Sequence, residues 1–126
     1  MQLKKLLRLQ LFYYFLGIAF NAVSYNLITN GGQGLTPNDP IAGSIGMTIY
    51  ALFLIPGFLR KIPFYRILMG IAVLLLGYGG VVNHFNFMRD TPELYHSVIA
   101  GAIGVSINIF GLILNILAAA GKFKKD

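Results

Sequence analysis

This sequence contains no cysteine and few charged side chains. Only 11% of its 126 residues are Asp, Glu, Lys or Arg, against roughly 25% in an ordinary soluble domain. The lack of cysteine excludes a disulfide-stabilised scaffold and any metal site built from thiolates. The shortage of charge, together with 56% hydrophobic residues, excludes a soluble enzyme domain and a disordered chain.

The charged residues that are present cluster and leave long uncharged runs between them. These runs cover residues 9–38, 40–59, 67–88 and 94–121. Each is about as long as the roughly 20 residues that cross a bilayer as a helix. Together with a mean hydropathy of +0.71, they predict an all-α integral membrane protein with four transmembrane helices.

The basic residues predict how the chain is oriented in the membrane. Arg89 is the only one expected on the outer side, which also holds Asp39, Asp90 and Glu93. The other nine flank the opposite helix ends: Lys4, Lys5, Arg8, Arg60, Lys61, Arg66, Lys122, Lys124 and Lys125. By the positive-inside rule, both termini are expected in the cytoplasm, in a bacterial inner membrane. The net charge of +6 is thereby explained without a nucleic-acid partner.

Capping residues and prolines predict where the helices begin and end. Asp39-Pro40 offers a cap followed by a first-turn proline, Pro63 marks a third helix, and the acidic segment 90–93 offers a final cap. The expected spans are about 5–29, 41–59, 64–88 and 92–120, within one domain of residues 1–126. Short connections predict a four-helix antiparallel transmembrane bundle.

Each expected span carries one face of small and polar residues. In membranes such faces hold helices together, because burying leucine against leucine gains little in lipid. The residues expected at helix contacts are Gly77, Gly80, Ala100, Gly104 and Gly111. The residues expected in a polar interior are Asn21, Tyr50, Asn108 and Asn115. Interhelical hydrogen bonding is one interpretation of these faces, and a polar cavity or ligand groove is the other.

His84 and His96 form the one constellation with possible chemistry. Their midpoint in the sequence is Asp90, so a hairpin closing there would place them at the same depth near the outer surface. Neutral imidazoles bind zinc, copper or haem iron. Two histidines without a third ligand are an incomplete zinc set, so a structural interfacial pair is the preferred interpretation. Contact with a headgroup or substrate is a further alternative. No cofactor is expected otherwise.

The glycine-containing segment 30–40 is expected to form a turn outside the membrane. It lacks the Lys-Ser/Thr ending of a nucleotide-binding loop, and no strand precedes it. A second interpretation is that it folds over the mouth of the bundle or contacts a partner.

The chain contains no nucleophile elbow and no acidic pair placed to bind magnesium, so it is not expected to be an enzyme. We expect an accessory or assembly subunit that packs against other membrane helices, as a homo- or hetero-oligomer within the lipid bilayer. A small oligomeric transporter or channel with a polar interior is the alternative, although no carboxylate lies within a span to couple protons. A wet cavity would favour transport, whereas a dry core with a glycine groove facing lipid would favour an interaction role.

Overall fold

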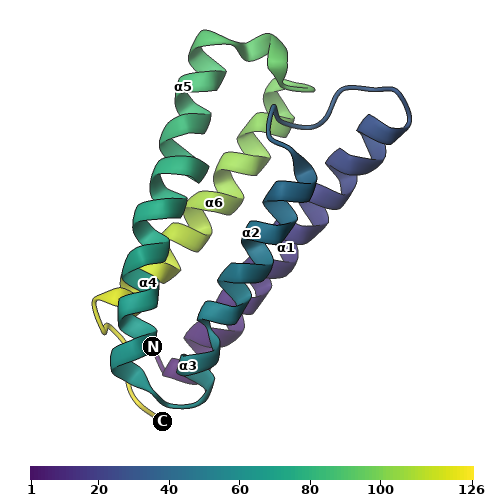
Figure 1. The fold of residues 1–126 in the computed structure, drawn as a ribbon. Helices are drawn as coiled ribbons and strands as arrows, with labels where there is room; N and C mark the ends of the chain where they lie inside the picture. The colour runs from purple at the N-terminus through teal and green to yellow at the C-terminus, as the bar shows by residue number, and fades with distance from the viewer.

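A computed structural model describes residues 1–126 as a chain of helices. Four helical spans are long and apolar enough to cross a membrane: Leu3–Thr29, Pro40–Phe58, Ile62–Asp90 and Val98–Ala119. Figure 1 shows the N- and C-termini at the same end of the bundle, which we call the terminal end. The segments 30–39 and 91–97 connect helices at the opposite end, which we call the loop end.

The first two spans are joined at the loop end. Helix α1 (Leu3–Thr29) is followed by Gly31, whose φ of +83° suits glycine because it has no Cβ. Helix α2 (Pro40–Phe53) begins at a proline, which needs no N–H partner in the first turn. The carboxylate of Asp39 accepts a hydrogen bond from the Ile41 N–H at 3.0 Å and so caps this helix.

A short basic turn at the terminal end connects the second and third spans. The second span breaks at Leu54 and ends in the single turn α3 (Ile55–Phe58), where Pro56 cannot donate a backbone hydrogen bond. Helix α4 (Ile62–Leu76) starts just before Pro63. Between them Arg60 adopts a φ of +61°, a conformation uncommon for residues with a side chain.

The third span changes its helical type near its middle. Residues Gly77–Val82, with the sequence GYGGVV, form the π-helical segment η1, and helix α5 (Asn83–Asp90) completes the span. π-helical turns are rare and are frequent at functional sites. This segment forms one wall of the pocket described below.

The fourth span, α6 (Val98–Ala119), begins at Val98 and not near residue 92 as expected. Pro92–Leu94 forms a separate 3-10 turn, η2. The cap is the hydroxyl of Ser97, which accepts a hydrogen bond from the Ala100 N–H at 3.0 Å. His96 therefore lies in the connection and outside the helix.

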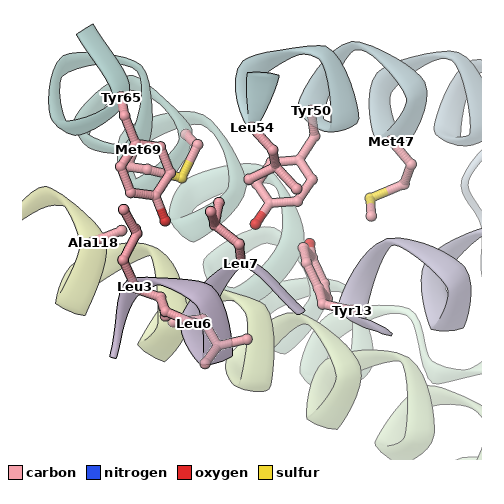
Figure 2. Close-up of a cluster of buried hydrophobic side chains, with 12 residues drawn as sticks. Leu3, Leu6, Leu7, Tyr13, Met47, Tyr50, Leu54, Tyr65, Met69 and Ala118 are labelled. Atoms are coloured by element: carbon pink, nitrogen blue, oxygen red, sulfur yellow. The ribbon is translucent and has the colours of Figure 1, made fainter. Parts of the chain in front are cut away.

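The core lies in the half of the bundle nearest the termini. Figure 2 shows Leu3 and Leu7 of α1 facing Tyr65 and Met69 of α4, with Ala118 of α6 beside them. The packing differs between pairs of helices, since α1 packs along α2 and α6, and α4 along α6, whereas α2 and α4 meet over a short stretch only. The main hydrophobic core is therefore concentrated near the termini.

The two ends of the chain contact each other at the terminal end. The Lys124 N–H donates to the Met1 carbonyl at 2.7 Å, and the Leu3 N–H donates to the Lys124 carbonyl at 2.9 Å. The Arg60 guanidinium and the Asp126 carboxylate form an ion pair of 2.7 Å nearby, and this arginine holds the pKa of Asp126 below its ordinary value.

Candidate functional site

A network of buried polar side chains crosses the core of the terminal half. The Gln10 amide donates from Nε2 to Asn115 Oδ1 at 3.0 Å and contacts the Met69 sulfur at 3.2 Å. The Tyr50 hydroxyl donates to the same Asn115 oxygen at 2.7 Å, and the Tyr65 hydroxyl donates to Gln10 Oε1. These groups come from α1, α2, α4 and α6, so the network joins all four spans.

Close packing surrounds this network. Tyr13 is fully buried, and a Cβ at Gly111 would fall on its ring. Only the Asn115 amide nitrogen, Nδ2, is buried without a hydrogen-bond partner. In this half of the molecule the polar face of each span is used for helix contacts.

A pocket of about 380 Å³ lies between this core and the loop end. Residues of α1 and α6, among them Gly17, Phe20 and Gly104, line the part that we call its floor, and residues of α2 and the third span line the parts that we call its sides. Most of the wall is apolar. The polar side chains in the lining are neutral amides, hydroxyls and one imidazole: Asn21, Thr36, Asn38, Tyr50, His84 and Asn108.

Two asparagines of the floor sit against glycines of the sides. The Asn21 amide donates to the Gly17 carbonyl at 2.9 Å, and its Oδ1 lies 2.6 Å from where a Gly43 Cβ would be. The Asn108 amide donates to the Gly80 carbonyl at 3.0 Å, and its Cγ lies 3.0 Å from where a Gly80 Cβ would be. Only glycine leaves room for these amides, so Gly43 and Gly80 set their positions at the pocket surface.

His84 lies at the loop end of the pocket and both of its ring nitrogens have partners. Asn38 Nδ2 is 3.0 Å from Nε2, and the Tyr95 hydroxyl is 2.8 Å from Nδ1. An amide nitrogen can only donate, so Nε2 accepts and the ring proton lies on Nδ1. The Tyr95 hydroxyl accepts that proton and donates to the His84 carbonyl at 3.3 Å. Burial raises the pKa of Tyr95.

The segment 30–40 folds over the loop end, as the second interpretation of its sequence predicts. The Leu35 N–H donates to the Ser24 hydroxyl at 3.0 Å, and the Leu35 carbonyl accepts from the His96 N–H at 3.2 Å. Gln33 donates to the Glu93 carbonyl at 2.8 Å. The two connections at this end therefore hold each other, and Thr36 and Asn38 reach the pocket.

The structure distributes the residues expected in a polar interior over both halves. Asn21, Tyr50 and Asn108 line the pocket, whereas Asn115 lies outside it in the packed network. The residues expected at helix contacts are close to neighbouring side chains in most cases: Gly104 faces Phe20, Gly111 faces Tyr13, Gly77 faces Leu112, Gly80 faces Asn108, and Ala100 is buried.

The ring nitrogens of His84 bond to residues other than His96, with which His84 was expected to pair. His84 is buried and bonded to Asn38 and Tyr95, while His96 is exposed in the turn before α6. No three His, Cys, Asp or Glu side chains come together in a possible metal-binding group. Metal binding by the two histidines stays a prediction, which elemental analysis of the purified protein tests.

Sequence reasoning missed three features of the site. Tyr65 donates to Gln10 in the buried network, and nothing in the sequence marks this tyrosine as part of a polar face. Asn38 reaches His84 from a connection 46 residues away in sequence. The GYGG run of η1 was the available signal for an irregular helix, because glycine favours departures from α-helical geometry.

No protein-family model, curated protein or solved structure matches this chain. The geometry of the pocket is therefore the basis for assigning a function.

Proposed function

We propose that this protein is a non-enzymatic integral membrane protein that binds an amphipathic small molecule in the pocket at its loop end. The observation that carries the proposal is the pocket itself, about 380 Å³ in volume and lined by all four spans and the segment 30–40. Binding sites for small molecules commonly enclose roughly 300–1,000 Å³, with apolar walls and a few placed polar groups. This pocket has both properties.

The chemistry of the lining supports binding over catalysis. It includes no carboxylate, lysine or arginine, so it offers no charged acid, base or ion-pair partner. The one imidazole, His84, has both ring nitrogens engaged by Asn38 and Tyr95. No lining hydroxyl is hydrogen-bonded to a base in the way that an activated nucleophile requires.

The closed core supports binding over conduction. Below the pocket, Tyr13, Leu54 and Met69 are buried, and they pack in the hydrophobic core of the terminal half. A solute that entered at the loop end would meet this core and stop. The arrangement supports a site that holds a molecule rather than a pore through one copy of the chain.

The charge distribution supports an antiparallel bundle with both termini in the cytoplasm of a bacterial cell. Nine of the ten basic residues flank the terminal end, which the positive-inside rule places inside. The pocket then lies in the outer half of the inner membrane. A periplasmic phosphatase should be active when inserted near Gln33 and silent when fused after Asp126, and the opposite pattern would reverse this orientation.

An accessory role, in which a partner helix packs on the bundle, is the second candidate. Gly46 of α2 and Gly79 of η1 line the opening, and a Cβ at either would meet open space. Small residues on a lipid-facing surface let another helix approach closely. The same groove could therefore receive a transmembrane helix in a homo- or hetero-oligomer.

Two glycine variants test the proposal. Gly46→Leu places a side chain into the pocket, whereas Gly70→Leu adds the same side chain to α4 outside the pocket, also into open space. Both changes replace glycine by a better helix former. We expect native mass spectrometry in mild detergent to show a copurifying small molecule on the wild-type protein and Gly70→Leu, and none on Gly46→Leu.

Other results of this comparison would change the assignment. Loss of a copurifying membrane protein from Gly46→Leu, with no small molecule on the wild type, would support the accessory role. Identical spectra for all three proteins would refute the pocket as the functional site.

A further inference from the structure

We infer that the pocket takes an uncharged lipid with a hydroxyl headgroup, which enters from the outer leaflet; this inference rests on the proposed function and specifies its ligand. Three observations carry it: the neutral lining, the unused hydrogen-bonding atoms on that lining, and the lateral opening toward lipid.

The lining decides the charge of the ligand. None of its side chains is charged, and nine of the ten basic residues lie at the other end of the bundle. A phosphate or ammonium group taken into this pocket would leave water without gaining a counter-ion, which is strongly unfavourable. An uncharged headgroup carries no such cost.

The lining atoms that have no hydrogen-bond partner in the protein indicate the chemistry of the headgroup. Asn21 Oδ1 and Asn38 Oδ1 accept no hydrogen bond within the protein, although each amide nitrogen has a partner. Each amide also keeps a second N–H, because an amide nitrogen carries two. These two residues of the lining thus keep both acceptor and donor atoms without a partner in the protein. A hydroxyl matches this pattern because it donates once and accepts through its lone pairs, whereas a carbonyl would leave the two amide oxygens unpaired.

The size of the pocket decides how much of the lipid is enclosed. At roughly 30 Å³ for each water-sized group, about 380 Å³ holds about a dozen such groups. This volume suits a glycerol-sized head and the first carbons of its chains. The remaining chain has to leave the protein.

The opening between α2 and the third span gives the chain a route into the bilayer. Ile49 and Leu75 lie on the two rims of the pocket and are 48% and 66% exposed. Helices α2 and α4 make few contacts with each other, which leaves the space between them for the pocket. At that end Thr36, Asn38 and His84 close the pocket off. The lipid would therefore enter sideways, head toward the loop end.

The test compares three probes that share their acyl chains: dioleoylglycerol, its acetylated derivative, and dioleoylphosphatidic acid. Each is titrated into the full chain in detergent and followed by native mass spectrometry. We expect dioleoylglycerol to bind with a stoichiometry of one and about tenfold more tightly than the acetylated lipid, since capping the hydroxyl removes its donor. Binding should be lost in Gly46→Leu and kept in Gly70→Leu.

A change within the lining provides an independent measurement. Asn21→Ala removes one amide from the floor, and we expect it to weaken dioleoylglycerol binding about tenfold while binding of the acetylated lipid changes less. If Asn21→Ala does not fold, Asn38→Ala, which removes the other amide whose oxygen has no partner, should show the same selective weakening.

The outcomes separate the inference from the proposed function. Phosphatidic acid attracted by the basic terminal end would bind equally to Gly46→Leu, so only binding that this variant abolishes is counted. Pocket binding that prefers phosphatidic acid or the acetylated lipid would overturn the hydroxyl headgroup and leave the proposed function standing. Binding of no probe, combined with no copurifying molecule that Gly46→Leu removes, would overturn both.

Discussion

The two halves of this bundle use the same residue types for different purposes. In the terminal half, Gln10 and Asn115 bond to each other and to tyrosine hydroxyls inside a closed core. In the loop half, Asn21 and Asn108 lie on glycines and face a pocket. A stripe of small and polar residues along a helix therefore does not show whether that face packs against another helix or lines a binding pocket.

What separates the two halves is the size of the side chains on the facing helix. Tyr13, Tyr50 and Tyr65 fill the space between helices in the terminal half, and all three are buried. In the loop half Gly46 and Gly79 stand where bulky residues could close the gap, and nothing occupies the position of their Cβ atoms. Glycine in a membrane bundle can thus mark either close contact or open space.

The largest expected effect comes from adding the same side chain to one glycine in each half. Gly111→Leu would force the Tyr13 ring out of the core, and we expect it to destabilise the protein by about 3 kcal/mol, at the upper end for overpacked cores. Gly46→Leu should not lower the thermal unfolding temperature in detergent, because a Cβ there meets open space. Equal tolerance of the two changes would mean that the terminal half is no more tightly packed than the loop half.

The next effect concerns the buried network. Asn115→Leu leaves Gln10 Nε2 and the Tyr50 hydroxyl without their acceptor, and unsatisfied buried groups cost about 2 kcal/mol in total here. The double variant Tyr50→Phe/Asn115→Leu removes one of those orphaned groups. It should be more stable than Asn115→Leu alone in chemical or thermal unfolding. A double variant that is less stable would show that the network does not couple these residues.

The spans and their buried faces could be predicted from the sequence for a physical reason. Charge is excluded from the bilayer core, so uncharged runs of sufficient length report helices directly, and the structure has four such helices. Gly104, Gly111 and Asn115 are buried because helical spacing places them on one face of α6. These features depend on local sequence and on the solvent alone.

The start of α6 and the pocket could not be predicted in this way. Asp90 and Ser97 are both residue types that can cap the start of α6, and the structure uses Ser97. The connection before Ser97 is held by contacts with the segment 30–40, such as that of Gln33 with the Glu93 carbonyl. The pocket depends on how far α2 and the third span diverge, and on the π-helical segment η1. Such long-range geometry leaves no periodic signal in the sequence.

A smaller effect is expected where the pocket meets the loop end. Tyr95→Phe removes the hydroxyl that bonds to the His84 ring and carbonyl. This change removes one hydroxyl, whereas Asn115→Leu leaves two buried groups without their acceptor, so we expect a smaller loss of about 1 kcal/mol. A larger loss would show that the loop half is as closed to water as the terminal half.

The pH dependence of stability tests the same contact. Burial raises the pKa of Tyr95 above its ordinary value of 10.0. The contribution of this residue is therefore complete below about pH 10 and is lost as the pH rises through the raised pKa. Thermal unfolding of the wild type should weaken more steeply above about pH 10 than that of Tyr95→Phe. Parallel curves would contradict the burial of this hydroxyl.

The smallest effect should come from the charged groups at the terminal end. Arg60 lowers the pKa of Asp126, so their ion pair contributes above the ordinary pKa of that carboxyl and is lost as the pH falls through the lowered value. The Arg60 side chain is 50% exposed, and exposed pairs add little because water screens them. Asp126→Asn should therefore leave the unfolding temperature at pH 7 nearly unchanged. The shift should be far smaller than the shift caused by Gly111→Leu. If Asp126→Asn proves as damaging as Gly111→Leu, contacts between the chain ends, and not the tyrosine-filled core, would be what distinguishes the terminal half from the loop half.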